Sequence, residues 1–238
     1  LKRKAFKKIC LIISCLLVVE IILLFPKEKE VGSLNHTIDT GILYLLDDNN
    51  YVSRVDYLYN AQKTEDLIRE MVEALTINNA KSLKIRSGFK AVLPEKTKLL
   101  SLSIEGTCVT LNFSKELLEI DSKTEEKMLE ALIYSITTIE EIDSIILKVE
   151  GNQLEYLPHS KKKLPAILDR SFKINKEYNL KSMQNITETT IYYLAKKDDY
   201  LYYIPVTKYT NSNKEKIEII IDELKSSTTY NTNLISYL

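Results

Sequence analysis

The feature that most constrains this chain is a segment that occurs twice. Residues 42–55 read ILYLLDDNNYVSRV and residues 191–204 read IYYLAKKDDYLYYI, so an apolar run, a polar turn, a tyrosine and a second extended run recur 149 positions apart. The helix that follows each copy keeps this offset in its apolar positions, which are Ile68, Met71, Val72 and Leu75 in the first copy and Ile217, Ile220, Ile221 and Leu224 in the second. One offset that holds through two strands and a helix indicates an internal duplication.

The first copy spans residues 40–151 and begins with a hairpin and a helix. Residues 42–46 are all apolar, which predicts a central strand buried on both faces, and residues 51–59 form a second strand. The helix after them has an amphipathic stripe, and we expect Thr64 to cap its first turn.

The rest of the first copy is a second hairpin, a second helix and a last strand. Leu100, Leu102 and Ile104 alternate with polar residues, as do the apolar residues after the turn, which is typical of an antiparallel sheet covered on one side. Residues 122–125 (SKTE) predict a capping box for the second helix, and residues 144–150 a final strand. The expected fold class is α+β: a two-layer sandwich whose mainly antiparallel sheet carries two helices on one face.

The second copy, residues 190–238, follows a connector at residues 152–189 that includes three consecutive lysines, 161–163. Its strands repeat those of the first copy, with Pro205 weakening the edge of the second strand, and residues 212–215 (SNKE) predict another capping box. Residues 234–238 (LISYL) align with residues 89–93. No counterpart of the second hairpin, second helix or final strand follows, so we expect this copy to be a fragment of a complete module.

The N-terminus, residues 1–30, predicts a membrane anchor and its flank, joined to the first copy by a tether at residues 31–39. Five basic residues precede the apolar run at residues 9–25, which as a helix would reach roughly 25 Å and so span a thin hydrocarbon core. The basic flank favours a single-pass topology with the bulk of the chain outside the cytoplasm. Two alternatives are a cleaved signal peptide and a lipoprotein attached through Cys15. Glu20 lies within the run, and we interpret it as tolerated there.

Composition and motifs exclude several functional classes. Net charge is +0, which offers no overall attraction to nucleic acid. There are 5 Gly and no phosphate-binding loop motif. The 3 Cys have no zinc or disulfide spacing, Cys108 being an isolated thiol, and His36 and His159 are interpreted as solvated.

No pattern of catalytic or metal-binding residues emerges. Asp47 and Asp48 lie on a turn that lacks the spacing of a calcium loop, so turn formation explains them better. Glu140, Glu141 and Asp143 form an acidic helix end, but nothing places a second carboxylate at the separation a glycosidase needs. The expected site therefore contains no catalytic, cofactor-binding or metal-binding residue, and no cofactor is implied.

Several strings in chain order resemble a known module. They are ILYLLDDNNYVSRV (42–55), MVEAL (71–75), AVLPEKTKLLSLSIEG (91–106), VTLNFSKEL (109–117), EALIYSITTIEEID (130–143) and SIILKVEG (144–151), followed by DRSFKINKEY (169–178) in the connector. They resemble the GerMN domain of bacterial sporulation and spore germination proteins, which often carry two such domains behind a membrane signal. The resemblance implies a fold similar to ring-building modules and an extracytoplasmic assembly role, and implies no reaction. The loop at residues 76–88 departs from the family's Gly- and Pro-rich loop, since its only glycine is Gly88.

The leading hypothesis is a membrane-anchored, non-enzymatic interaction module whose partners are other proteins of a cell-envelope or sporulation complex. The strand tyrosines motivate an alternative, a protein that binds cell-wall glycan such as peptidoglycan. The tyrosines that could form such a surface are Tyr57, Tyr59, Tyr192 and Tyr202, although tyrosine is also an ordinary strand residue. A cell-wall hydrolase is a third alternative.

Overall fold

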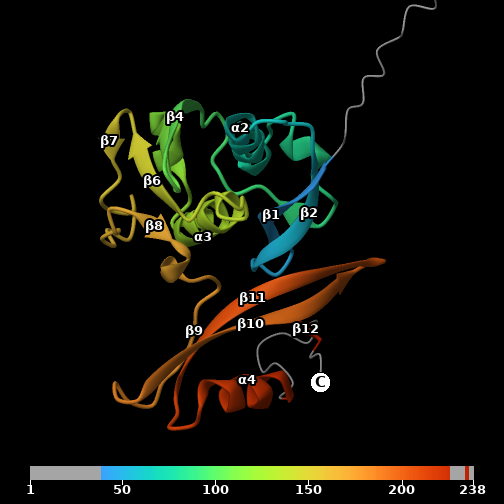
Figure 1. Ribbon diagram of the computed structural model, residues 1–238, viewed down its shortest axis with the longest axis vertical. Helices are drawn as coiled ribbons and strands as arrows, with labels where there is room; N and C mark the ends of the chain where they lie inside the picture. The colour runs from blue at the N-terminus through green and yellow to red at the C-terminus, as the bar shows by residue number, and fades with distance from the viewer. Residues whose placement is uncertain (1–38, 226–233, 236–238) are drawn as a thin grey trace, which may run out of the picture. The chain divides into compact units, whose positions relative to one another are not determined.

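Two β-sheets organise the part of the chain that the computed structural model describes, residues 39–225 and 234–235 (Figure 1). The first sheet has the order β12-β10-β11-β2-β1-β3, with β9 paired to β11, and the second has the order β4-β5-β6-β7, with β8 paired to β6. The strands of the first sheet are β1 (Asp39–Asp47), β2 (Val52–Tyr59), β3 (Phe89–Lys90), β9 (Glu177–Asn179), β10 (Ile186–Lys197), β11 (Tyr200–Asn211) and β12 (Leu234–Ile235). Those of the second are β4 (Leu99–Glu105), β5 (Cys108–Phe113), β6 (Ser144–Val149), β7 (Asn152–Gln153) and β8 (Leu168–Asp169).

The described helices are three α-helices and three short 3₁₀ turns. The α-helices are α2 (Thr64–Leu75), α3 (Glu125–Ile136) and α4 (Lys216–Lys225), and the 3₁₀ turns are η1 (Ser82–Lys84), η2 (Lys115–Glu119) and η3 (Arg170–Phe172). None of these helices is both long and apolar enough to cross a bilayer. The apolar run at residues 9–25, on which the predicted anchor depends, lies outside the described residues.

The strand expected to be buried on both faces is confirmed as β1. It lies between β2 and β3, and its four residues from Leu43 to Leu46 are at most 5% exposed. The N–H of Tyr44, at its free edge, donates to the Ser135 hydroxyl of α3 at 2.9 Å. Helix α3 therefore covers the part of β1 that no strand pairs with, which satisfies a backbone group that would otherwise be buried without a partner.

All three side-chain caps predicted from the sequence are wrong. Helix α2 already includes Thr64, its N-cap is Lys63, and no side chain caps it. Thr124 precedes α3 without a capping bond. Ser212 accepts a hydrogen bond from the Lys214 N–H, which closes a local turn before α4. Hydroxyl and amide side chains in such positions also form turns with nearby backbone, so the sequence pattern alone does not decide between the two.

The expectation of a single sheet with both helices on one face is also wrong. Strands β1–β3 and β4–β6 of the first repeat belong to different sheets, and α3 contacts β1 and β2 of one sheet as well as β6 and β8 of the other. Residues 128–136 of α3 are buried without interruption, as expected for a helix enclosed from both sides. The α+β class and the mainly antiparallel pairing hold. The exceptions are β5–β6 and β9–β11, which pair in parallel, and the crossover through α3 is what makes the first of them possible.

The second repeat reproduces the start of the first. Its β10–β11 hairpin pairs over twelve residues, from Ile186↔Asn211 to Lys197↔Tyr200, and is longer than the sequence pattern predicted. Helix α4 follows at the expected offset, and β12 pairs antiparallel with β10 as β3 pairs with β1. In the first repeat Leu46 pairs with Lys90, and in the second its equivalent Ala195 pairs with Leu234. Leu234 therefore corresponds to Lys90, so the expected alignment of Leu234 with Phe89 is displaced by one residue. The internal duplication itself is confirmed.

Candidate functional site

The two repeats meet where β2 of the first crosses β11 of the second, and we call this contact the junction. The strands pair antiparallel through Arg54 and Tyr203, and the Arg54 guanidinium lies 5.9 Å from the centre of the Tyr203 ring. Asp48 and Lys197 form an ion pair across the same contact. Both pairs join positions 149 apart, so equivalent residues of the two repeats face each other.

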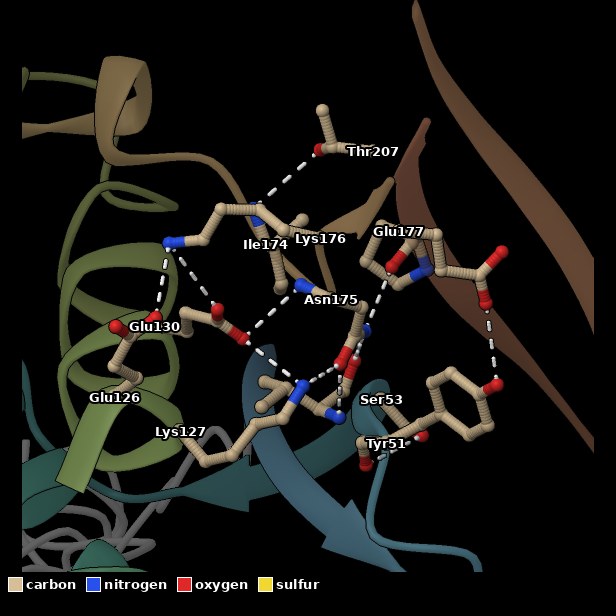
Figure 2. A network of polar contacts seen from close by, with 12 residues as sticks. Tyr51, Ser53, Glu126, Lys127, Glu130, Ile174, Asn175, Lys176, Glu177 and Thr207 are labelled. Carbon is tan, nitrogen blue, oxygen red and sulfur yellow. Dashed lines mark hydrogen bonds and ion pairs between the residues drawn. The ribbon is translucent and has the colours of Figure 1, made fainter. Parts of the chain in front are cut away.

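Asn175, in the connector, fills the centre of the junction (Figure 2). Its amide oxygen accepts from the Val52 N–H at 2.9 Å and from the Lys127 ammonium at 2.8 Å. Its amide nitrogen donates to the carbonyls of Val52 at 2.8 Å and Pro205 at 2.7 Å. The side chain is 2% exposed and every hydrogen-bonding position of its amide is used. Its φ of 46° lies in the left-handed region, which asparagine tolerates better than most residues.

Pro205 explains why a side chain is needed at this point. The antiparallel register set by Arg54 and Tyr203 places Val52 opposite Pro205. Proline has no N–H, so β11 cannot donate to the Val52 carbonyl there. The amide of Asn175 supplies the missing donor and accepts from the Val52 N–H in return, acting as a short piece of strand between the two repeats.

A network of charged residues from α3 and the connector surrounds Asn175. The Glu130 carboxylate, 2% exposed, accepts from the Asn175 N–H at 3.0 Å and pairs with Lys127 at 3.4 Å and Lys176 at 3.5 Å. Lys176 also pairs with Glu126 and lies 4.1 Å from the centre of the Phe172 ring. A buried carboxylate is tolerable only with such partners, so this network fixes α3 against the connector.

Aromatic residues complete the junction on its other side. The Phe89 ring packs edge-on against Tyr202, with centroids 4.8 Å apart, and the Arg86 guanidinium lies 4.1 Å from the centre of the Tyr200 ring. The Tyr200 hydroxyl accepts from the Asp56 N–H at 2.9 Å. The loop before β3 and the hairpin of the second repeat are thus packed together, which adds apolar area to the polar contacts of Asn175.

The titratable groups of the junction are shifted mainly by burial. Burial raises the pKa of Asp47 above its usual range, although the backbone of Tyr51 and Asn49 and the Tyr202 hydroxyl bond to it. Burial and the Glu177 carboxylate raise the pKa of Tyr51 to about 12. These shifts come from burial and from contacts within the fold.

The acidic residues considered in the sequence analysis are either bonded within a turn or exposed to solvent. Asp47 is 1% exposed and closes its own turn, as the turn interpretation predicted. Glu140, Glu141 and Asp143 are exposed to solvent. Among the described residues, no three His, Cys, Asp or Glu side chains are grouped so as to hold a metal ion. His159 is exposed, with one ring nitrogen 2.6 Å from the Ile120 carbonyl, and His36 lies outside the described residues.

The tyrosine surface expected from the sequence is not formed. Tyr57 and Tyr202 are buried, at 5% and 6% exposure, and Tyr59 is half-buried. Only Tyr192 is exposed, at 41%. Tyr57 and Tyr59, at alternate positions of β2, lie on the more buried face of that strand, while Asp56 and Leu58 lie on the exposed face.

Sequence reasoning missed Asn175, Glu130 and Lys176, which carry the junction. The available signal was the string DRSFKINKEY at residues 169–178, which resembles the family but shows no periodicity. Its side chains act across distances of 30 to 123 residues in the chain, and such contacts have no local pattern.

The chain is similar to proteins of a known family. Residues 42–155 match the family model Germane, described as "Sporulation and spore germination". Residues 42–155 form a domain of this family. The tandem GerMN domains of the sporulation protein GerM from Bacillus subtilis superpose on it with a TM-score of 0.77 at 26% identity, covering 84% of this chain and 71% of that one. The match includes both repeats and supports their tandem arrangement.

Two further proteins are similar to this chain. The first GerMN domain of the same sporulation protein superposes with a TM-score of 0.50 at 26% identity, covering 56% of this chain and 98% of that one. The spore germination protein GerM of Bacillus subtilis (strain 168) is 32% identical over 187 residues, which are 76% of this chain and 50% of that protein. The chain thus spans half the length of this curated relative.

Proposed function

We propose that this chain is a membrane-anchored, extracytoplasmic and non-enzymatic interaction module that acts in sporulation or spore germination. The observation that carries the proposal is the junction, in which buried Glu130 and Asn175 are bonded to other parts of the same chain. Groups paired in this way hold two repeats in a fixed relation and are not free for chemistry.

The surfaces left exposed favour a protein partner. Strand β4 is an edge strand paired only with β5, and its Leu100 is 48% exposed. Helix α4 exposes Ile217 at 62% and Ile221 at 38%. Open strand edges and apolar helix stripes are features that other proteins recognise by strand addition and groove packing. The proposed partners are other proteins of a cell-envelope or sporulation complex, with the membrane holding the N-terminus.

The location is tested by thiol labelling in intact cells. Ser101 is exposed on β4, and in a variant that lacks all three native cysteines, S101C should react with a membrane-impermeant maleimide without lysis. Labelling only after lysis would contradict an extracytoplasmic position. In the otherwise native chain, Cys15→Ala separates the two modes of attachment, because a lipoprotein would lose its membrane fraction and an anchor formed by residues 9–25 would not.

The interaction role is tested in the sporulating host. Asn175→Ala should reduce germination and co-purification of envelope proteins, while Asn179→Ala, an exposed neighbour on β9, should behave as wild type. A wall-hydrolysing activity of the purified chain that is abolished by Glu140→Gln with Glu141→Gln would overturn the proposal in favour of an enzyme.

A further inference from the structure

A polar pocket of about 420 Å³ lies beside the junction, between the start of α3, the loop at residues 158–162 and the connector. We call it the Tyr178 pocket after the central residue of β9. Its lining includes Lys123, Glu126, Lys127, Lys162, Lys176 and Tyr178. The volume is within the range of about 300 to 1,000 Å³ that small-ligand sites occupy.

Tyr178 lines this pocket, and its ring is held by a second tyrosine. Tyr178 is 64% exposed, and its ring stacks on Tyr209 with centroids 4.8 Å apart and an angle of 12° between the planes. The two residues are direct partners in the parallel β9–β11 ladder. One face of the Tyr178 ring is therefore covered, while the exposed remainder is held in place by strand pairing. Such an arrangement costs little entropy when a ligand stacks on it.

The pocket is lined by four lysines and three glutamates, so positive side chains exceed negative ones by one. Glu125 bonds to the backbone N–H groups of His159 and Ser160, at 2.9 and 2.8 Å, so its charge is used within the fold. Lys123 is exposed, and no ion pair of its ammonium group is found in the described part of the chain. Lys162 pairs with Glu126 at 2.8 Å, but both side chains are 38–45% exposed. An exposed pair of this kind contributes little and can be exchanged for a ligand carboxylate.

We propose that the Tyr178 pocket binds a carboxylated glycan, of the kind found in a cell wall whose sugar chains carry acidic peptides. A sugar ring offers a C–H face that stacks on an aromatic ring, and hydroxyls that bond to serine and carboxylate groups. The ammonium groups of Lys123 and Lys162 would bind the acidic substituents. The inference rests on the proposed extracytoplasmic function for access to the wall, whereas the binding itself is a property of the purified chain.

The experiment uses the full chain in detergent and measures binding by calorimetry. The probes are solubilised peptidoglycan fragments, a neutral N-acetylglucosamine oligomer, polyglutamate as carboxylates without sugar, and a teichoic-acid polymer as phosphates with sugar. Peptidoglycan fragments should bind best. Tyr178→Ala should weaken them about five- to tenfold, Tyr178→Phe less than twofold, and Lys123→Glu should weaken them while leaving the neutral oligomer unchanged.

Tyr192→Ala is the matched control, because Tyr192 is an exposed strand tyrosine outside the pocket, and it should bind as wild type. Failure of peptidoglycan to bind, equal binding of polyglutamate, preference for teichoic acid, or wild-type binding by Tyr178→Ala would each overturn the proposal. If Tyr178→Ala does not fold, the binding measured for Tyr178→Phe and Lys123→Glu tests the proposal instead. If the pocket does not bind these fragments, the labelling and germination results are unaffected. Failure of the binding proposal can therefore be told apart from failure of the proposed function.

Discussion

Helices α2 and α4 carry the same apolar stripe but have different surroundings. Ile68 and Val72 of α2 are 0% and 3% exposed, whereas the equivalent Ile217 and Ile221 of α4 are 62% and 38% exposed. In the first repeat, α2 packs against α3 and β4. Within residues 39–225 and 234–235, the second repeat contains no counterpart of either element. An amphipathic pattern therefore specifies a face to be covered, and the cover must come from another part of the module.

The largest expected effect separates these two helices directly. Ile68→Ala should lower the free energy of unfolding by about 4 kcal/mol, because it leaves a cavity in a closed core. Ile217→Ala should change it by less than about 0.5 kcal/mol, because the side chain is mostly in solvent. Urea unfolding of both variants measures the difference. Equal losses would mean that the stripe of α4 is covered in solution.

The next effect concerns the junction between the repeats. Asn175→Ala should cost about 3 kcal/mol, because it leaves Val52 and Pro205 with buried backbone groups that lack partners. It should also separate unfolding into two transitions, since the repeats lose their shared contact. Chemical unfolding followed by two probes, one in each repeat, would detect this. Asn179→Ala is the control, and a single unchanged transition for Asn175→Ala would show that the aromatic contacts suffice.

The smallest effect is a pH dependence at the contact between α3 and the connector. Burial would raise the pKa of Glu125, but hydrogen bonds from Ser160 and His159 outweigh it and hold the pKa below its usual range. A lowered pKa means that the stabilisation is present above the unfolded value of 4.5 and is lost as the pH falls through the folded value. Glu125→Gln should cost roughly 1 kcal/mol at pH 7 and much less near pH 3. Thermal unfolding across this range tests it, and a cost that does not change with pH would contradict it.

Much of the fold could be predicted because it depends on patterns in short stretches of the sequence. The apolar run of β1, the stripes of α2 and α3 and the alternation in β4 and β5 each identified their element, and the constant offset identified the repeat. The division into two sheets was not predictable in the same way. It depends on which neighbours enclose α3, and the sequence of α3 shows only an apolar stripe, although the polar residues Glu130 and Ser135 are buried as well.

The candidate site was less predictable than the fold. The absence of a catalytic pattern led to the interaction hypothesis, but the residues that build the junction were not identified. Asn175 has no periodic neighbours, and its role follows from Pro205, which is 30 residues later and opposes a strand of the other repeat. Tyr178 was likewise missed, because its exposure and its stacking on Tyr209 result from a three-residue strand too short to recognise.

The bonds of Asn175 also set an order on folding. Asn175 bonds to Val52, 123 positions earlier, and to Pro205, 30 positions later. The first repeat can form its own local contacts while the outer edge of β2 is still unpaired. The junction can form only after β11 has been synthesised and has paired with β10. Pairings between such distant segments form slowly, and an open strand edge can pair with another molecule in the meantime. The interval between the two events is therefore when this chain is most exposed to misassembly.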